Sequence, residues 1–297
     1  MQAASTISEL PWIEAPRRAY NGRMDAVERV YAFYESWRGE KRVIGRSVCG
    51  RPIVAVHAGG AGRQLLLQYA IHAREWVTCL LALEHAARGV PRGGAWFVPL
   101  SDPDGAALAL RGERFLRGVS EAHRRFLLDI NKNSVDFSMW KANAAAVDLN
   151  VNFDAAWGTG VRNVRVPAPE NYIGPAPFSE PESRALRDFA LALRPAATVS
   201  YHTKGAEIYW EFGQRGQSRA RDEGIARALA AETGYRARRI EGSAGGFKDW
   251  CIHALGIPAF TIEAGSDALS HPLNEDALPA LSEENAGVLR VLSELLT

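Results

Sequence analysis

The stretch Leu65-Leu66-Leu67-Gln68-Tyr69-Ala70-Ile71-His72-Ala73-Arg74-Glu75-Trp76 decides the fold of this chain. Its first six residues form an apolar-rich run, which predicts a largely buried strand, and residues 77–90 carry a helical pattern. His72 and Glu75 therefore lie where a strand passes into a helix. Ligands of open α/β sheets bind beyond the carboxyl ends of the strands. The pair is a candidate for two zinc ligands, but a surface histidine beside a helix N-terminal glutamate would give the same pattern, and zinc needs at least one more ligand.

The remainder of the chain alternates between strand and helix patterns. Strands are expected over residues 42–57 as a hairpin and over 95–100, 196–202 and 259–263, and helices over 24–37, 179–193, 218–233 and 283–296. Ser179 and Glu182 have capping-box spacing, and residues 101–105 are rich in turn formers. This alternation predicts a mostly parallel or mixed sheet covered by helices on both faces. No repeat or linker divides the chain, so we expect one catalytic domain over residues 1–297, with residues 1–20 as an N-terminal extension.

One segment departs from this pattern. Residues 157–178 contain several glycines and prolines and show no apolar periodicity. A loop of more than about 15 residues is uncommon in a compact domain and is usually functional or mobile. A surface-packed excursion is the alternative interpretation.

Composition excludes several function classes. The formal net charge is +1, from 35 basic and 34 acidic residues, which gives no electrostatic footprint for nucleic acid or an anionic membrane. Cys49, Cys79 and Cys251 are odd in number and lack C-x-x-C spacing, so neither a disulfide framework nor a thiolate zinc site is indicated. No apolar run has the length of a transmembrane helix, and no secretory signal is evident. We therefore expect a cytoplasmic protein.

Three further residues supply the chemistry that His72 and Glu75 lack. His202 follows the apolar strand pattern, and with the first two residues it completes a His₂Glu set that leaves a zinc position open for water, as in catalytic sites. Asp148 is a candidate to accept the second N–H of a zinc-bound histidine from a short strand-like run, or else a turn residue. Glu263 ends another apolar strand and is either a solvated strand end or a general base.

Three blocks in order carry a family resemblance. They are His-Ala-Arg-Glu-Trp at residues 72–76, Val-Asp-Leu-Asn-Val-Asn-Phe at 147–153 and Ala-Gly-Gly-Phe-Lys-Asp-Trp at 244–250. Over about residues 46–273 the chain resembles zinc metallocarboxypeptidases of the carboxypeptidase A type. Segments 140–143, 201–205 and 243–250 look most like bacterial γ-D-glutamyl-diaminopimelate peptidases, which cut cell-wall peptides.

This resemblance implies a single-domain α/β fold with a mixed, mainly parallel eight-stranded sheet flanked by helices. It also implies one zinc ion per chain, held by His72, Glu75 and His202 at the carboxyl rim of the sheet. Glu263 corresponds to the catalytic glutamate that takes a proton from the attacking water. Lys141 stands near the position of an arginine that stabilises the oxyanion, and lysine retains the charge without the two-pronged donor set.

The substrate side departs from the family pattern. Arg74 and Asn150 are expected to contact substrate, but Val151 replaces the arginine that clamps a terminal carboxylate. Either another cation (Arg162, Arg165 or Lys204) holds the carboxylate, or a free terminus is not required. The family's mobile pocket tyrosine would fall near Glu241, and Tyr209 or Tyr172 is a possible replacement.

Lys248 falls at the base of the pocket that receives the side chain after the scissile bond. An ammonium there favours a substrate side chain that ends in a carboxylate, such as diaminopimelate, whose amine Glu241 or Asp249 could accept. A lysine that reaches solvent from a loop is the alternative.

Three functional interpretations remain. The first is a zinc peptidase that acts on small muropeptides, and the second is a conventional carboxypeptidase or another zinc amide hydrolase. The third is an inactive binding homologue, against which the presence of Glu263 argues, because a binding module needs no base. The sequence does not indicate an oligomeric state.

Overall fold

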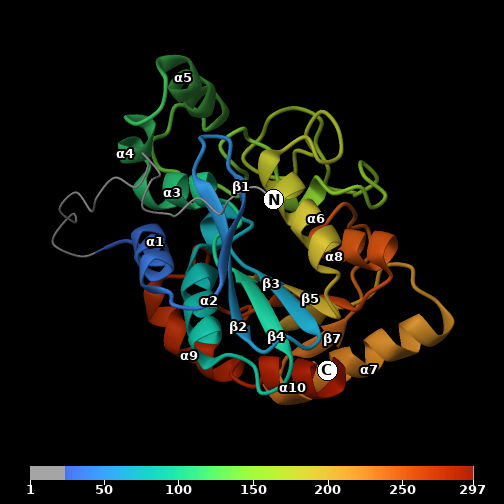
Figure 1. Cartoon of the computed structure of the whole chain (residues 1–297). Helices are drawn as coiled ribbons and strands as arrows, with labels where there is room; N and C mark the ends of the chain where they lie inside the picture. The colour runs from blue at the N-terminus through green and yellow to red at the C-terminus, as the bar shows by residue number, and fades with distance from the viewer. Residues whose placement is uncertain (1–23, 297) are drawn as a thin grey trace.

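The computed structural model describes residues 24–296, so the expected extension over residues 1–20 lies outside the described residues (Figure 1). Its centre is an eight-stranded sheet with the order β1-β2-β4-β3-β5-β8-β6-β7. The strands are β1 (Lys41–Arg46), β2 (Pro52–Gly59), β3 (Gln64–Gln68), β4 (Gly94–Val98), β5 (Ala197–His202), β6 (Glu207–Tyr209), β7 (Arg236–Arg238) and β8 (Ala259–Glu263).

The middle of this sheet is parallel, and an antiparallel pair adjoins it on each side. β3 pairs in parallel with β4 and β5, and β5 pairs in parallel with β8. β1 with β2, β2 with β4 and β6 with β8 are antiparallel, while β6 and β7 are parallel. The expected mixed, mainly parallel eight-stranded sheet is therefore confirmed. Its parallel centre brings the carboxyl ends of β3, β5 and β8 to one rim.

Helices cover both faces of the sheet, as the two hydrophobic cores show. In β3, Leu65 and Leu67 belong to one core, and Leu66, which points to the opposite face, belongs to the other. The first core contains residues of α1, α2, α3, α7, α9 and α10, and the second contains residues of α6 and α8. Burial on both faces explains why the central strands read as continuous apolar runs.

The helices lie before, between and after these strands along the chain (Figure 1). They are α1 (Ala26–Ser36), α2 (Val77–Arg88), α3 (Pro103–Arg111), α4 (Glu113–Leu116), α5 (Glu121–Ile130), α6 (Pro181–Leu193), α7 (Gly216–Thr233), α8 (Phe247–Trp250), α9 (Leu278–Glu284) and α10 (Val288–Leu296). Short turns of other helix types are η3 (Ala73–Glu75), η4 (Leu149–Val151), η5 (Cys251–Leu255) and η6 (Glu275–Ala277). Within residues 24–296, none of the helices has both the length and the apolar character that crossing a membrane requires.

The capping box expected at the start of α6 is wrong. The N-cap is Glu180, with no side-chain capping bond, and Pro181 is the first helical residue. Ser179 Oγ instead donates to Glu180 Oε1 at 2.8 Å. Glu182 accepts hydrogen bonds from the Val48 backbone N at 2.9 Å and from Asn143 Nδ2 at 3.2 Å. Ser179 Oγ also accepts from Asn152 Nδ2 at 2.9 Å. Partners that are distant in the sequence therefore contact both side chains that the local pattern assigned to the cap.

Two other local expectations need correction. The closing helix expected over residues 283–296 is divided into α9 and α10, and Asn285 ends α9 while its Nδ2 donates to the Tyr235 hydroxyl at 3.1 Å. The turn formers at 101–105 begin helix α3, with Asp102 Oδ1 accepting from Gly105 N at 2.9 Å. Helices α3 to α5 were not predicted.

The segment 157–178 contains no named helix or strand in the described structure, as the sequence predicts. It includes an isolated bridge between Val164 and Tyr172. Its first part packs against the segment before α8, because the Val161 backbone N donates to Gly242 O at 2.9 Å. The long loop therefore forms a wall beside the rim of the sheet.

Candidate active site

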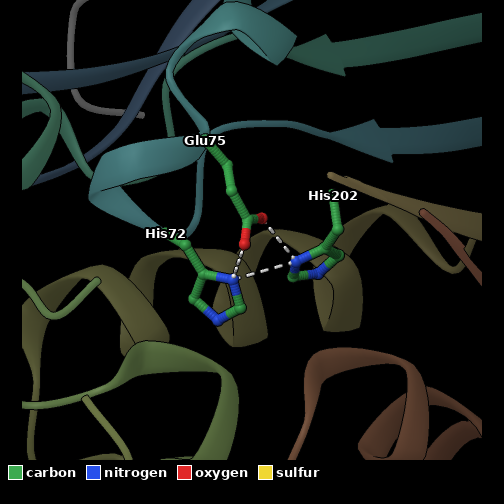
Figure 2. Close-up of side chains that lie close together, drawn as sticks. All are labelled: His72, Glu75 and His202. Carbon is green, nitrogen blue, oxygen red and sulfur yellow. Dashed lines mark hydrogen bonds and ion pairs between the residues drawn. The ribbon is translucent and has the colours of Figure 1, made fainter. Parts of the chain in front are cut away.

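His72 and Glu75 are positioned by the turn that joins β3 to α2. His72 has an extended backbone and precedes η3, of which Glu75 is the last residue. Thr78 fixes this turn, since its hydroxyl donates to Glu75 O at 2.9 Å and accepts from the Ala70 backbone N at 2.9 Å. The two side chains project to the same side, as Figure 2 shows.

His202 meets this pair from the end of β5. Because β3 and β5 are parallel neighbours, their carboxyl ends lie at one rim. His202 Nδ1 lies 3.0 Å from His72 Nδ1 and 2.9 Å from Glu75 Oε2, and His72 Nδ1 lies 3.0 Å from Glu75 Oε1 (Figure 2). The three residues are at most 4% exposed. Among the described residues, they are the group whose geometry could hold a metal ion.

The donor set fits zinc. Two imidazole nitrogens and one carboxylate are the ligands of many catalytic zinc sites, whose donor atoms lie about 3.3 Å apart in a tetrahedral arrangement. Electron-pair donors as close as those of His72, Glu75 and His202 repel one another unless a proton or a cation lies between them. Burial of both histidines beside the carboxylate is therefore consistent with a cation that they share.

Asp148 supports His72 from behind. It precedes η4, so the strand expected around it is wrong, and its Oδ1 accepts from the Asn150 backbone N at 3.1 Å. The same oxygen lies 3.3 Å from His72 Nε2. A proton on Nε2 leaves the Nδ1 electron pair facing Glu75 and His202. This arrangement is the carboxylate–histidine support typical of zinc sites.

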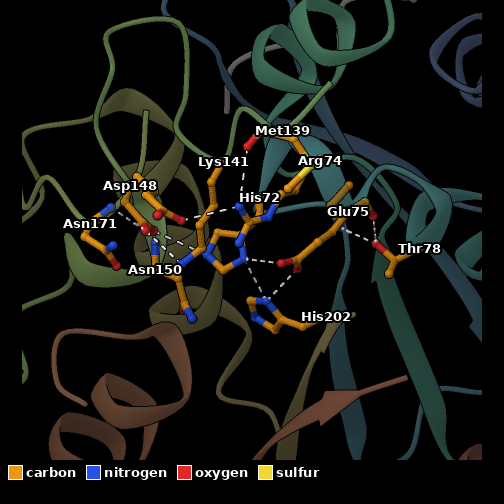
Figure 3. Close-up of polar contacts among 12 residues, drawn as sticks. His72, Arg74, Glu75, Thr78, Met139, Lys141, Asp148, Asn150, Asn171 and His202 are labelled. Carbon is orange, nitrogen blue, oxygen red and sulfur yellow. Dashed lines mark hydrogen bonds and ion pairs between the residues drawn. The ribbon is translucent and has the colours of Figure 1, made fainter. Parts of the chain in front are cut away.

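Lys141 lies against the other oxygen of Asp148, with Nζ 3.0 Å from Oδ2. The Asn171 backbone N also donates to Oδ2 at 3.0 Å (Figure 3). The Ala73 backbone N donates to Lys141 O at 3.1 Å, which fastens this segment to η3. Asp148 thus connects His72 to Lys141.

Charge within the cluster offsets the cost of burial. Burial by itself would raise the pKa of Asp148, but Lys141 and His72 lower it strongly. Burial would also raise the pKa of Glu75, and His72 and His202 hold it well below its usual value. For Lys141 burial lowers the pKa, yet Asp148 and Glu75 outweigh that effect and raise it. Lys141 is therefore a cation at neutral pH.

Glu263 lies beside the ligand set, because it is paired with His202 in the β5–β8 ladder. Burial raises the pKa of Glu263 to about 7, and the negative charge of Glu75 acts in the same direction. A carboxylate with a pKa near the working pH can both accept and return a proton.

A cavity of about 510 Å³ opens from this cluster. Its walls carry charges of both signs, which include the basic residues Lys141, Arg162 and Lys248 and the acidic residues Glu241, Asp249 and Glu263. Neutral polar residues that line it include Asn150, Asn163, Asn171 and Tyr209. Volumes of this order suit small-molecule or short-peptide ligands.

Lys248 is buried in the cavity wall rather than directed to solvent as a loop lysine. It is 5% exposed, and its Nζ donates to Asp249 Oδ1 at 2.5 Å and to Glu211 O at 3.0 Å. Asp249 also accepts from the Gly246 backbone N at 3.1 Å. Asn150 Oδ1 accepts from the Phe247 backbone N at 3.1 Å. The cavity therefore contains a buried ion pair on a fixed backbone.

Gly245 allows this backbone to approach the segment after Asp148. Its φ is +83°, and a Cβ there would lie 2.9 Å from Val151 O. Its N–H donates to Ala155 O at 2.8 Å, and its carbonyl accepts from Phe153 N at 2.9 Å. Another side chain at this position would be strained and crowded.

The remaining candidate substrate residues are divided between the cavity and other positions. Val151 and Arg162 line the cavity. Arg74, Arg165 and Lys204 are not among the described residues that line it. Arg74 Nη1 lies 3.3 Å from Glu170 Oε2. Of the three cations considered as replacements for the carboxylate clamp, Arg162 is therefore the one in the cavity wall.

The two tyrosines considered as replacements for the pocket tyrosine also differ in their position relative to the cavity. Tyr209 lines the cavity and its hydroxyl donates to Glu207, whereas Tyr172 is 9% exposed and is not among the described lining residues. Asn171 was not anticipated. It has a φ of +65°, a conformation in which asparagine is common, but no sequence pattern indicated that its N–H would reach Asp148.

Comparison with known proteins agrees with this arrangement. The zinc carboxypeptidase family matches residues 35–286. A γ-D-glutamyl-L-diamino acid endopeptidase of Lysinibacillus sphaericus is 32% identical over 86% of this chain and 67% of its own length. An uncharacterised Bacillus subtilis protein, YqgT, is 30% identical over 84% of this chain and 70% of its own length.

Solved structures show the same fold. Bovine thrombin-activatable fibrinolysis inhibitor superposes with a TM-score of 0.71 at 20% identity, over 91% of this chain and 94% of that chain. Murein-tripeptide amidase from Escherichia coli O157 superposes with a TM-score of 0.57 at 25% identity, over 87% of this chain and 95% of that chain. From the extent of the family match and the identity to its relatives, the chain belongs to the zinc carboxypeptidase family.

Proposed function

We propose that this chain is a zinc-dependent peptidase that hydrolyses the amide bond between γ-D-glutamate and diaminopimelate in muropeptides. His72, Glu75 and His202 would hold one zinc ion. When bound, zinc acts as a Lewis acid that lowers the pKa of water and polarises a carbonyl. Similarity to a γ-D-glutamyl-L-diamino acid endopeptidase and to a murein-tripeptide amidase supports this substrate class.

Glu263 would act as the general base. It faces the same cavity as His72, and its pKa of about 7 allows it to take a proton from the attacking water and to return it to the leaving amine. Lys141 carries a fixed positive charge in the same wall. We assign it to the oxyanion that develops on the carbonyl. Asp148 would hold the tautomer of His72.

The observation that carries the substrate assignment is the buried Lys248–Asp249 pair in the cavity. Diaminopimelate has a side chain that ends in both a carboxylate and an ammonium group. Lys248 can receive the carboxylate, and Asp249 or Glu241 can receive the ammonium. Lys248 and Asp249 remain paired with each other whatever binds, but an aliphatic side chain would displace water from these charges without offering a hydrogen bond, which is costly.

A carboxylate at the main chain of the same residue would meet Arg162 and Asn150. Val151 lacks the charge needed for a clamp, whereas the Arg162 guanidinium makes no ion pair with the described residues and lines the cavity.

A conventional carboxypeptidase acting on neutral C-terminal side chains is the competing function, and an inactive homologue would have no use for Glu263. A cytoplasmic location remains part of the proposal.

The test compares three peptides, L-Ala-γ-D-Glu-X, in which X is diaminopimelate, lysine or leucine. We expect the highest kcat/KM for diaminopimelate, since lysine lacks the distal carboxylate and leucine lacks both charges. Lys248→Met should remove the preference for diaminopimelate over lysine. Arg165→Ala is the matched control, because Arg165 contacts Gly158 O outside the cavity. Equal rates on all three peptides would refute the assignment.

A further inference from the structure

Three basic residues lie near the proposed metal site but outside the cavity wall. Arg74 belongs to the 72–76 segment, Lys204 follows His202 by two residues, and His271 lies on the loop after β8. None of them is among the described residues that line the cavity. The cavity would receive the amine side of the scissile bond, so basic residues that lie near the proposed metal site but outside the cavity wall are candidates to meet the acyl side.

Lys204 and the loop that carries His271 are joined by several contacts. Lys204 Nζ donates to Asp267 O at 2.6 Å and lies 2.9 Å from Asp267 Oδ1. The backbone N–H groups of Gly205 and Ala206 both donate to Gly265 O at 2.8 Å. The side chain of Lys204 is only 16% exposed, whereas that of Asp267 is 80% exposed. The ammonium is therefore held in place, and its counterion is largely in water.

Two polar atoms in this group have no partner. His271 Nδ1 and Arg74 Nε are buried and make no hydrogen bond within the described structure. Buried polar atoms are nearly always hydrogen-bonded, and leaving one unpaired is costly. The remaining contacts of Arg74 are long, since Nη1 lies 3.4 Å from Met139 O and 3.3 Å from Glu170 Oε2. These side chains are incompletely satisfied and suit an acceptor from outside the chain.

His271 lies within electrostatic reach of both cations and of the metal site. Burial lowers the pKa of its ring, Glu75 opposes that effect, and Arg74 and Lys204 lower the pKa further. The ring is thus neutral at neutral pH and can donate one hydrogen bond. Together the group offers two positive charges and a neutral donor beside the ligand set.

We propose that Lys204 and His271, with Arg74 beside them, bind a free carboxylate on the acyl side of the scissile bond. This inference rests on the proposed function. In a γ-linked glutamyl substrate the scissile carbonyl belongs to the side chain, so the α-carboxylate stays free a few bonds away. An α-linked peptide whose side chain is neutral has no carboxylate in the corresponding region. The three residues would therefore favour γ-linked glutamyl substrates over α-linked peptides with neutral side chains.

The test uses two substrates that differ at this carboxylate alone, L-Ala-γ-D-Glu-diaminopimelate and its α-amide, which carries D-isoglutamine. We expect the wild-type enzyme to prefer the free acid by about tenfold or more in kcat/KM, as for a charge-assisted hydrogen bond. Lys204→Met and His271→Ala should each bring the ratio of the two kcat/KM values toward one, mainly by lowering kcat/KM for the free acid. Misfolded enzyme in a preparation lowers both rates by the same factor, so it does not change the ratio of the two kcat/KM values.

Asp267→Asn separates binding from loop anchoring. It removes the competing charge but keeps the backbone carbonyl that Lys204 contacts. If Lys204 binds the substrate carboxylate, this variant keeps or increases the preference for the free acid. Arg162→Ala, on the cavity side, should lower both rates and leave the ratio unchanged.

Three results would overturn the inference. Equal cleavage of the two substrates by the wild type would refute it and leave the proposed function intact. A Lys204→Met variant that loses activity equally on both substrates would reduce Lys204 to an anchor of the loop. Failure of the wild type to cleave either substrate would refute the proposed function, and the inference with it.

Discussion

Lys141 Nζ lies 3.0 Å from Asp148 Oδ2, while the other oxygen of Asp148 lies 3.3 Å from His72 Nε2. One buried carboxylate therefore compensates a cation in the cavity wall and orients a proposed zinc ligand. In the proposed mechanism the two roles can be separated, because a change at Lys141 would act on the oxyanion and a change at Asp148 would act on the metal.

Replacing Lys141 by alanine should lower kcat by about 10² to 10³, the cost of losing one oxyanion donor. Lys141→Arg should restore part of the rate, since it restores the charge. Zinc content, measured in the same preparations, should stay at one ion per chain. A kcat equal to that of the wild type would remove Lys141 from the mechanism.

Replacing Asp148 by asparagine should weaken zinc binding by about 10- to 100-fold, because the charge that orients His72 is lost. Competition with a chelator of known affinity measures the effect. Asn150→Ala is the matched control, since Asn150 lies in the adjacent η4 turn and contacts Phe247 N rather than His72. Unaltered affinity in Asp148→Asn would contradict the supporting role of Asp148.

Activity should fall as the pH is lowered. Burial raises the pKa of Glu263 to about 7, and the base works only when it is deprotonated. A bound zinc ion would draw this pKa down, so we expect the acid limb of kcat/KM between about pH 5 and pH 7, with a slope of tenfold per pH unit. Zinc content must be checked at each pH. A flat profile over this range would show that Glu263 is not the titrating base.

A second group of carboxyls should govern stability rather than activity. Asp102 and Glu182 are fully buried. Burial, followed by the charge of Asp104, raises the pKa of Glu182 to about 8, and burial with the charge of Glu182 raises that of Asp102 well above its usual value. Because both values are raised in the folded state, the protonated forms favour folding. The stability that the protonated forms contribute is complete at pH values below about 4, and the part that belongs to Glu182 is lost as the pH rises through about 8.

Asp102→Asn should therefore stabilise the protein at alkaline pH. The amide keeps Oδ1 for the Gly105 N–H and removes a charge from Oδ2, which has no hydrogen-bond partner within the described structure. We expect a gain on the order of 1 kcal/mol in the free energy of unfolding at pH 8 and little change at pH 4. Denaturant unfolding at the two pH values measures it. A variant destabilised equally at both would show that Asp102 is ionised throughout.

Strand ends were the most informative part of the sequence. The apolar runs before His72, His202 and Glu263 predicted buried parallel strands, and parallel strands bring their carboxyl ends to one rim. The composition of those ends then predicted a His₂Glu set with a nearby carboxylate, and the structure places these residues together. Continuous apolar runs were sufficient here, because strands that are buried on both faces have little freedom in how they are arranged.

Contacts between distant loops could not be predicted in the same way. Glu182 had the spacing of a capping box, but Val48 and Asn143, far away in the sequence, compete for its carboxylate. The approach of Lys204 to Asp267 likewise depends on how two loops fold back. Strands β6 and β7, of three residues each, are too short to show a period.

The most direct test of the central claim is hydrolysis of L-Ala-γ-D-Glu-diaminopimelate in ¹⁸O-labelled water by the zinc-loaded protein, with the products analysed by mass spectrometry. We predict that the label enters the γ-carboxyl of released L-Ala-D-Glu, that free diaminopimelate carries none, and that Glu263→Gln forms neither product. Absence of cleavage, cleavage at the L-Ala–D-Glu bond, or full activity of Glu263→Gln would contradict the account.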